Sequence, residues 1–197
     1  MTHPFVETES KITIIDKMMS ATILHLIPSF ITPNHITAFR FGSLPFVIYF
    51  LSTGQFKLGL VAFVIAALSD AIDGAMARTR DQVTEWGKMY DPVADKMLIG
   101  TVAAIAVSKF LGKELAFAII LLEVVIMVYA FYRRRFLGAD ISAKKVGKIK
   151  MVLQSLGVGF LLLYMAWPVP ILLPISAYIL YASILFALLS LFVYRSI

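Results

Sequence analysis

Six apolar runs, each close to the length of a membrane-spanning helix, constrain the fold of this chain more than any other feature. A helix needs about 20 predominantly apolar residues to cross a bilayer. Hydrophobic residues make up 60% of the chain, and the mean hydropathy is +0.87. The expected spans are 35–53, 55–78, 90–109, 113–134, 148–167 and 171–194. The short loops leave no room for a soluble domain, so we expect an all-α integral membrane protein with a single domain over residues 1–197.

The first 31 residues are predicted to precede the six-helix transmembrane core at 32–197. From Lys11 to Ile27, apolar side chains recur at helical spacing and polar ones occupy another side. This pattern is typical of an amphipathic helix that lies in the membrane interface. Thr32-Pro33 then resembles an N-cap followed by proline at the first helical position, which predicts the start of span one. Asp91-Pro92 also fits a helix start.

The distribution of basic residues predicts the orientation of the chain. An even number of spans places both termini on one side of the membrane. Of the 18 lysines and arginines, only Lys57, Lys109 and Lys113 then fall on the opposite side. Cytoplasmic loops carry the excess of Lys and Arg, so both termini are expected in the cytoplasm and the chain in the cytoplasmic (inner) membrane. The net charge of +6 lies in short loops, which suits anionic lipids and phosphates and does not suggest nucleic acid.

Six carboxylates are concentrated in residues 70–95 of this apolar chain, and four of them occupy fixed positions of the pattern D-x-x-D-G-x-x-A-R-x8-G-x-x-x-D-x-x-x-D. The fixed positions of the pattern are Asp70, Asp73, Gly74, Ala77, Arg78, Gly87, Asp91 and Asp95. Ionised groups in a membrane are costly, so the acids need a neutralising partner. Carboxylate oxygens suit the hard cations Mg²⁺ and Mn²⁺. The alternative is that the acids are helix-end caps and surface ion pairs.

The spacing of the acids predicts a site at the cytoplasmic ends of two helices. Asp70 and Asp73 are three residues apart, and Asp91 and Asp95 are four apart, so each pair shares one helix face. Two such ends can close around one or two metal ions, and two ions can clamp the attacking and leaving oxygens of a phosphoryl transfer. The motif lies on the predicted cytoplasmic side.

The other fixed residues of the motif suit a phosphorylated ligand. Gly74 and Ala77 are small enough to let a flat base or a ribose approach the backbone, and Gly87 allows a similarly close approach at the next helix. Arg78 can bridge phosphate oxygens through parallel hydrogen bonds. The alternatives are that Gly74 permits tight helix packing and that Arg78 is an interface anchor.

The eight-residue motif resembles the signature of the class I CDP-alcohol phosphatidyltransferases, which are integral membrane enzymes. The resemblance implies transfer of a phosphatidyl group from CDP-diacylglycerol to an alcohol, with release of CMP. It also implies that Asp70, Asp73 and Asp91 bind Mg²⁺ or Mn²⁺, with two ions expected. Asp95 would lie close to these ions and act as the general base. Members of the family are usually homodimers, so we expect a homodimer here.

Further segments point to the acceptor and the donor phosphates. Asn34, Thr37 and Arg40 resemble the P-N-x-x-T-x-x-R opening of the family, which favours Arg40 as a phosphate ligand over a snorkelling residue. The segments 91–96 and 147–150 resemble the phosphatidylglycerophosphate synthase branch, which implies glycerol 3-phosphate as acceptor. The residues expected to bind the acceptor phosphate are Arg133, Arg134, Arg135, Lys144, Lys145, Lys148 and Lys150.

Several alternatives stay open at this point. The basic cluster after span four also fits a positive-inside loop with no role in substrate binding. Span four reads Leu122-Glu123 where that branch usually has Arg-Glu, and Glu123 is therefore a lone acid within an apolar run. Inositol phosphate and phosphatidylglycerol remain alternative acceptors. A different class of function, a non-catalytic membrane transporter or scaffold, is also compatible with six spans and buried acids.

Overall fold

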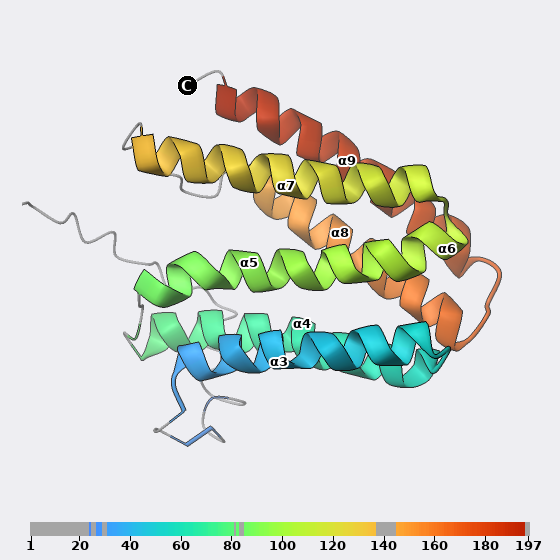
Figure 1. Cartoon of the computed structure of the whole chain (residues 1–197), viewed down its shortest axis with the longest axis horizontal. Coiled ribbons are helices and arrows are strands. Elements are labelled where there is room, and N and C mark those ends of the chain that lie inside the picture. The colour runs from blue at the N-terminus through green and yellow to red at the C-terminus, as the bar shows by residue number, and fades with distance from the viewer. Residues whose placement is uncertain are drawn as a thin grey trace, which may run out of the picture. The chain divides into compact units, whose positions relative to one another are not determined.

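A computed structural model describes residues 24, 27–28, 31–80, 82, 85–136 and 145–195, and most of these residues lie in helices (Figure 1). The elements are α3 (Pro33–Ser52), α4 (Phe56–Thr79), α5 (Glu85–Val102), η1 (Ala103–Val107), α6 (Ser108–Phe110), α7 (Lys113–Phe136), α8 (Lys145–Ala166) and α9 (Leu172–Arg195). No strand occurs among the described residues. The predicted all-α class is therefore confirmed.

Four of the described helices are long and apolar enough to cross a membrane, namely α4, α7, α8 and α9. The protein is therefore a multi-pass membrane protein. The two other expected spans coincide with α3 and with the continuous segment of α5, η1 and α6. In that segment the five-residue π-helix η1 interrupts the α-helical hydrogen bonding. The predicted interfacial helix at 11–27 lies outside the described residues, apart from Leu24 and Ile27.

The ends of the helices follow the local chemistry of the sequence. Helix α3 begins at Pro33 as predicted, and the ring of His35 accepts a hydrogen bond from the backbone N–H of Thr32. Gly54, with φ of 77°, forms the turn between α3 and α4, and Gly112, with φ of 111°, forms the turn before α7. Both angles lie in the left-handed region, which glycine adopts without steric cost.

The predicted helix start at Asp91-Pro92 is wrong. Helix α5 begins at Glu85, so Asp91 and Pro92 lie inside the helix. A proline can occupy the interior of a helix when its surroundings compensate for the missing N–H. The carboxylate of Asp91 is also unavailable as an N-cap, because it accepts a hydrogen bond from Thr37.

The chain forms two compact units, and each is described by itself. Unit 1 comprises residues 1–42 and 66–94, and it holds the first part of α3, the last part of α4 and the first part of α5. Its apolar cluster joins Leu24 to Ala75 and Met76 of α4. Arg80 fixes the same segment, because its guanidinium donates hydrogen bonds to the carbonyls of Leu24 and Ile27 at 2.9 and 2.8 Å.

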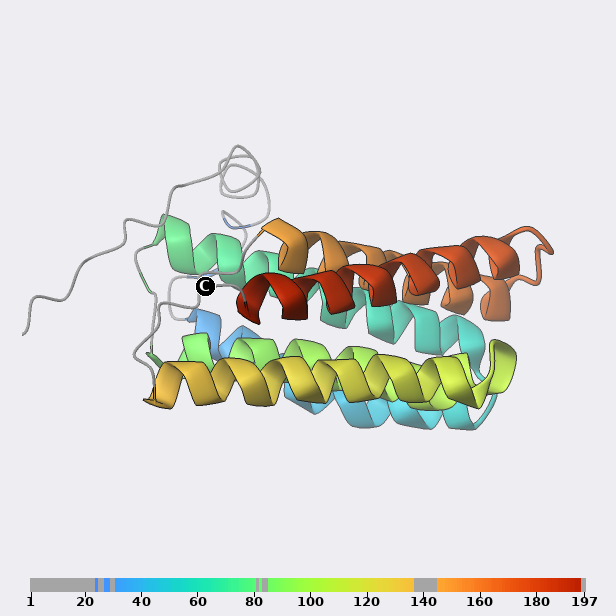
Figure 2. The ribbon, with the colours of Figure 1, turned by 90° about the horizontal axis from the view of Figure 1, so that it is seen from above.

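Unit 2 comprises residues 43–65 and 95–197, and it holds the other parts of α3, α4 and α5 together with η1, α6, α7, α8 and α9. Helices α8 and α9 pack along each other (Figure 2). A Cβ atom on Gly157 of α8 would lie 2.7 Å from Cγ of Leu180 on α9, so only glycine allows this approach. Ser176 also donates a hydrogen bond to the carbonyl of Gly157 at 2.8 Å. Small residues commonly permit such close helix contacts in membranes.

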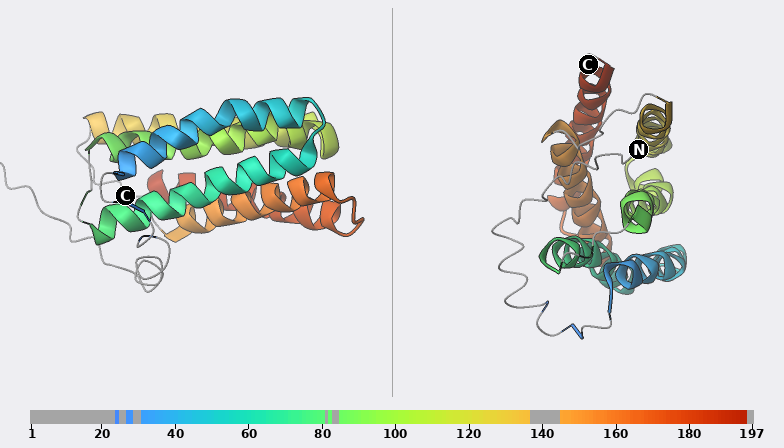
Figure 3. Two further views of the ribbon diagram at one scale, coloured as in Figure 1. Left: turned by 90° about the horizontal axis from the view of Figure 1, so that it is seen from below. Right: turned by 90° about the vertical axis from the view of Figure 1, so that its left-hand side faces the viewer.

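The hairpin of α3 and α4 in unit 2 has a similar close approach (Figure 3). A Cβ atom on Gly59 would lie 2.6 Å from Cδ2 of Leu51. The turn is closed by the Thr53 hydroxyl, which donates a hydrogen bond to the carbonyl of Tyr49 at 2.7 Å. The fold thus positions polar residues on rigid, closely packed helices.

Candidate active site

Three of the four motif aspartates belong to one polar network in unit 1. Asp70 and Asp73 lie near the end of α4, and Asp91 lies in α5. Asp73 is buried, whereas the side chain of Asp70 is 44% exposed. The predicted spacing of three residues places Asp70 and Asp73 against the same partner, Arg40 of α3. The fold therefore brings two acids together with a base that precedes them by 30 or more residues in the chain.

The guanidinium of Arg40 provides the positive charge within this cluster. The side chain of Arg40 is fully buried, and Nη2 donates a hydrogen bond to Asp73 Oδ2 at 2.6 Å. Nη1 lies 2.9 Å from Asp70 Oδ1, a contact that is an ion pair without the alignment of a hydrogen bond. Nε donates a longer bond of 3.3 Å to the hydroxyl of Ser69. Buried charges are tolerated only when paired in this way, so Arg40 does not snorkel outward.

Thr37 links the two helices that carry the acids. It lies one turn before Arg40 on α3 and is buried. Its hydroxyl donates a hydrogen bond to Asp91 Oδ1 at 2.6 Å. The hydroxyl oxygen of Thr37 also lies 3.4 Å from Asp73 Oδ2. Thr37 and Arg40, both predicted as site residues, therefore hold Asp70, Asp73 and Asp91 together.

The cluster offers carboxylate oxygens of the kind that bind a divalent metal ion. Among the described residues, no three His, Cys, Asp or Glu side chains lie in an arrangement that could hold a metal ion as they stand. The donor set nevertheless fits a hard divalent cation, because two of its carboxylates already share one positive charge. Asp70, Asp73 and Asp91 would hold the ion. The predicted Mg²⁺ or Mn²⁺ site stays a prediction.

The small residues of the motif lie beside these acids in unit 1. A Cβ atom on Gly74 would lie 3.2 Å from Nη1 of Arg78, so the guanidinium of Arg78 covers the glycine. Ala77 is half-buried near the end of α4, and Gly87 is buried in α5. Gly74 thus provides the space that the Arg78 side chain occupies, and a ligand that approaches this backbone would meet the guanidinium first.

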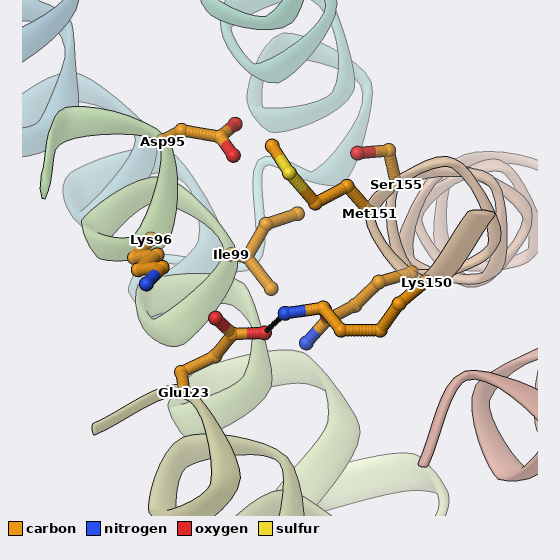
Figure 4. Close-up of a pocket in the computed structure, with 8 residues that line it drawn as sticks. Asp95, Lys96, Ile99, Glu123, Lys150, Met151 and Ser155 are labelled. Atoms are coloured by element: carbon orange, nitrogen blue, oxygen red, sulfur yellow. Dashed lines mark hydrogen bonds and ion pairs between the residues drawn. The ribbon is translucent and has the colours of Figure 1, made fainter. Parts of the chain in front are cut away.

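The fourth motif aspartate, Asp95, lines a pocket in unit 2 (Figure 4). It lies one turn beyond Asp91 on α5. The pocket is bounded by α5, α7 and α8, and its volume is about 240 Å³ when the space open to solvent is included. Its lining consists of Asp95, Lys96, Ile99, Glu123, Lys150, Met151, Gln154 and Ser155. A candidate general base and a predicted phosphate ligand, Lys150, therefore line the same pocket.

The centre of this pocket is an ion pair between two buried residues. Glu123 is 7% exposed and Lys150 is 4% exposed, and Lys150 Nζ donates a hydrogen bond to Glu123 Oε1. Figure 4 shows the two side chains pointing toward one another from α7 and α8, with Lys96 and Ile99 of α5 beside them. The second oxygen of Glu123, Oε2, has no hydrogen-bond partner among the described residues.

The remaining predicted phosphate ligands are placed differently. Lys148 lies on α8 but is exposed, and it does not line the pocket. Arg133, Arg134 and Arg135 lie at the end of α7, and their side chains fall outside the described residues. Lys144 also lies outside them, as does the side chain of Lys145. Among the side chains that the structure describes, Lys150 is thus the member of the predicted basic cluster that lines the pocket.

Several polar residues of these sites, Lys96 and Ser69 among them, were not among the site residues predicted from the sequence. Lys96 follows Asp95 directly and lines the pocket, and its ammonium interacts with the charges of Glu123, Lys150 and Asp95. Ser69 precedes Asp70 and accepts the hydrogen bond from Arg40 Nε. A signal for Lys96 existed, because a lysine one residue after a motif acid inside an expected span needs a partner. Ser69 had no comparable signal.

Comparison with known protein families identifies relatives over most of the chain. A family model described as CDP-alcohol phosphatidyltransferase matches residues 30–190. A protein of Rickettsia felis named CDP-diacylglycerol–glycerol-3-phosphate 3-phosphatidyltransferase is 31% identical over 134 residues, which are 66% of this chain and 74% of that protein. The protein of the same name from Bacillus subtilis is 32% identical over 151 residues, 67% of this chain and 76% of its own length.

A third relative matches a shorter segment. A protein of Drosophila melanogaster named probable cardiolipin synthase (CMP-forming) is 36% identical over 70 residues, which are 35% of this chain and 22% of that protein. The bacterial relatives therefore cover about twice as much of this chain as the insect protein does.

Proposed function

Because the chain belongs to the CDP-alcohol phosphatidyltransferase family, we propose that it transfers a phosphatidyl group from CDP-diacylglycerol to glycerol 3-phosphate and releases CMP. The names of the bacterial relatives, which match about two thirds of this chain, support this donor and this acceptor. The reaction belongs to phospholipid synthesis. Membership of this family of enzymes also favours an enzyme over a non-catalytic transporter or scaffold.

One observation carries the assignment of the acceptor site, namely the pocket that Asp95 and Lys150 share. A base and an ammonium in one pocket suit an acceptor that has both a reactive hydroxyl and a phosphate.

The proposed chemistry uses Asp95 as the general base. The carboxylate of Asp95 accepts the proton of the acceptor hydroxyl, and the oxygen attacks the β-phosphorus of the CDP-lipid. The bond between this phosphorus and the oxygen of CMP breaks, and CMP leaves with the electron pair of that bond. Lys150 and Lys96 hold the acceptor phosphate and so orient the hydroxyl for attack.

The donor is proposed to bind at the carboxylate network of unit 1. When bound, a divalent cation would neutralise the pyrophosphate and polarise its oxygens. Asp70, Asp73 and Asp91 would hold one or two Mg²⁺ or Mn²⁺ ions, and Arg78, beside Gly74, would bind phosphate oxygens. Arg40 would be released toward the phosphates as its two carboxylates exchange partners.

The proposal extends to the membrane arrangement. We infer that α3 and the segment of α5, η1 and α6 complete six spans in one domain over residues 1–197, preceded by an interfacial helix within residues 1–31. The asymmetry of lysine and arginine supports a site and termini that face the cytoplasm. A homodimer in the inner membrane is the expected assembly.

A CMP-release assay tests this function. The purified protein in mixed micelles receives CDP-diacylglycerol labelled in the cytidine, with one acceptor at a time and with Mg²⁺ or EDTA. We expect CMP release that depends on glycerol 3-phosphate and on Mg²⁺, and little release with free glycerol, inositol phosphate or phosphatidylglycerol. Faster release with one of those three acceptors would refute the assignment of the acceptor, and full activity after exhaustive chelation would refute the metal site.

A further inference from the structure

The unpartnered oxygen of Glu123 is the feature of the pocket that the proposed function leaves unexplained. Glu123 is a buried acid within an apolar stretch of α7. Its Oε1 accepts a hydrogen bond from Lys150, but its Oε2 is buried without a hydrogen-bond partner among the described residues. Buried polar atoms are almost always hydrogen-bonded in native proteins. Because Glu123 lines the pocket, the missing donor can arrive with the ligand.

The charges of the pocket limit what that ligand can be. The lysines at 96 and 150 are balanced by the acids at 95 and 123, and the ammonium of Lys96 interacts with the other three charges. A phosphate that binds Lys150 competes with Glu123 for the same ammonium. Once that pair loosens, both oxygens of Glu123 need hydrogen-bond donors. The ligand must then bring an anion for the lysines and a hydroxyl for Glu123.

We propose that Glu123 is a specificity-determining residue that accepts a hydrogen bond from the non-reacting hydroxyl of a phosphorylated polyol. The inference rests on the proposed function, because it places the acceptor in this pocket. Lys96 and Lys150 hold the phosphate, Asp95 receives the proton of the reacting hydroxyl, and Glu123 recognises the hydroxyl on the neighbouring carbon. Residues on α5, α7 and α8, all of which line this pocket (Figure 4), would thus bind the phosphate and both hydroxyls of the acceptor.

The test compares two acceptors that differ in that hydroxyl alone. Glycerol 3-phosphate has it, whereas 3-hydroxypropyl phosphate keeps the phosphate and a terminal hydroxyl but lacks the central one. The wild-type protein should prefer glycerol 3-phosphate by about ten- to a hundredfold in kcat/KM, the effect of one hydrogen bond to a charged group. Glu123→Met removes the acceptor oxygens and should bring this ratio close to one, and Glu123→Gln should give an intermediate ratio.

A matched control lies on the same helix. Glu114 is an exposed acid in the first turn of α7, so Glu114→Met should keep the ratio of the wild type. A purely structural role for Glu123, as counter-ion of Lys150, would lower kcat/KM equally for both acceptors. An unchanged ratio in the Glu123 variants would therefore overturn the inference.

The wild-type measurement and the isosteric variant keep the test decisive if Glu123→Met does not fold. If the wild-type protein used glycerol 3-phosphate and 3-hydroxypropyl phosphate equally well, this result alone would contradict recognition of the central hydroxyl by Glu123. An unchanged ratio in Glu123→Gln would contradict it as well. A wild-type protein that ignores both phosphates and uses phosphatidylglycerol would instead refute the proposed function, and this inference with it.

Discussion

Replacement of Arg40 by methionine should make the stability of the protein depend on divalent cations. Methionine keeps much of the length of the side chain but removes the only cation that the described structure places against Asp70 and Asp73. Asp73 is 3% exposed, so its charge would remain buried without its partner. We therefore expect a substantial loss of stability in the presence of EDTA.

The expected magnitude follows from the burial of the two ion pairs. Removal of one partner of a buried pair typically costs about 3–5 kcal/mol, and this range applies to the contact of 2.6 Å with Asp73. The side chain of Asp70 is 44% exposed, so its contact with Arg40 adds at most about 1 kcal/mol. For a chain of this size, 1 kcal/mol corresponds to roughly 2–4 °C in Tm. The variant should therefore unfold on the order of 10 °C below the wild type.

Magnesium should return part of this stability. A ligand present at 100 times its Kd stabilises the folded state by about 2.7 kcal/mol. In the wild type, the ion must displace the guanidinium from its carboxylates, so the net gain from Mg²⁺ is smaller. Thermal unfolding of the purified proteins in detergent, followed by far-UV circular dichroism with EDTA and with Mg²⁺, measures the increase in Tm for the wild type and for Arg40→Met.

A second arginine serves as the control for this experiment. Arg80 is half-buried in unit 1 and donates hydrogen bonds to backbone carbonyls. Its replacement by methionine also removes hydrogen bonds, but in the described structure these go to backbone carbonyls and to the sulfur of Met76, not to a carboxylate. Arg80→Met should lower Tm without a larger response to Mg²⁺. The reasoning is refuted if Arg40→Met has the stability of the wild type in EDTA, or if both variants respond to Mg²⁺ equally.

Three further predictions concern the base, the packing of unit 2 and the topology. Asp95→Asn should lower turnover by roughly 10²–10⁴-fold, a typical contribution of a general base, while equilibrium binding of CDP-diacylglycerol persists; near-normal turnover would exclude Asp95 as the base. Gly157→Ala should destabilise the protein by about 1–3 kcal/mol, because the new Cβ atom would lie 2.7 Å from Leu180, whereas Gly159→Ala, with no atom within 4 Å, should not lower Tm. Equal Tm values for the two variants would contradict the close packing. Asp140→Cys in this cysteine-free chain should resist an impermeant thiol reagent in intact cells and react in inverted vesicles, and labelling in intact cells would reverse the proposed orientation.

The lengths of the apolar runs were sufficient to predict the helices. Each expected span coincides with a helix or, between residues 85 and 110, with a continuous helical segment. The period of the hydrophobic pattern depends only on local geometry, so it can be read without knowledge of the neighbours. The early start of α5 at Glu85 was not predicted in the same way, because residues 85–89 lie before the apolar run and Asp91-Pro92 resembles a helix start.

The ion pairs between different helices could not be predicted from the sequence. The spacing predicted that Asp70 and Asp73 share a face, but it did not predict that Arg40, 30 residues earlier, is their common partner. Glu123 was identified as a lone acid in an apolar run, yet the sequence did not indicate which lysine neutralises it. Such pairs depend on which helices become neighbours, and no local period encodes that choice.

The two ion pairs have a common consequence for substrate selection. Asp73 and Glu123 are buried acids in a membrane protein, and each is neutralised by a base from another helix, Arg40 and Lys150. These pairs avoid isolated charges in the absence of substrate. In the proposed mechanism, a substrate that binds at either site separates a pair, and only a ligand with its own charges can compensate both partners. An uncharged alcohol such as free glycerol cannot do so, since it would leave Lys150 without an anion. Under this proposal, selection for charged substrates arises from the same interactions that allow the acids to be buried.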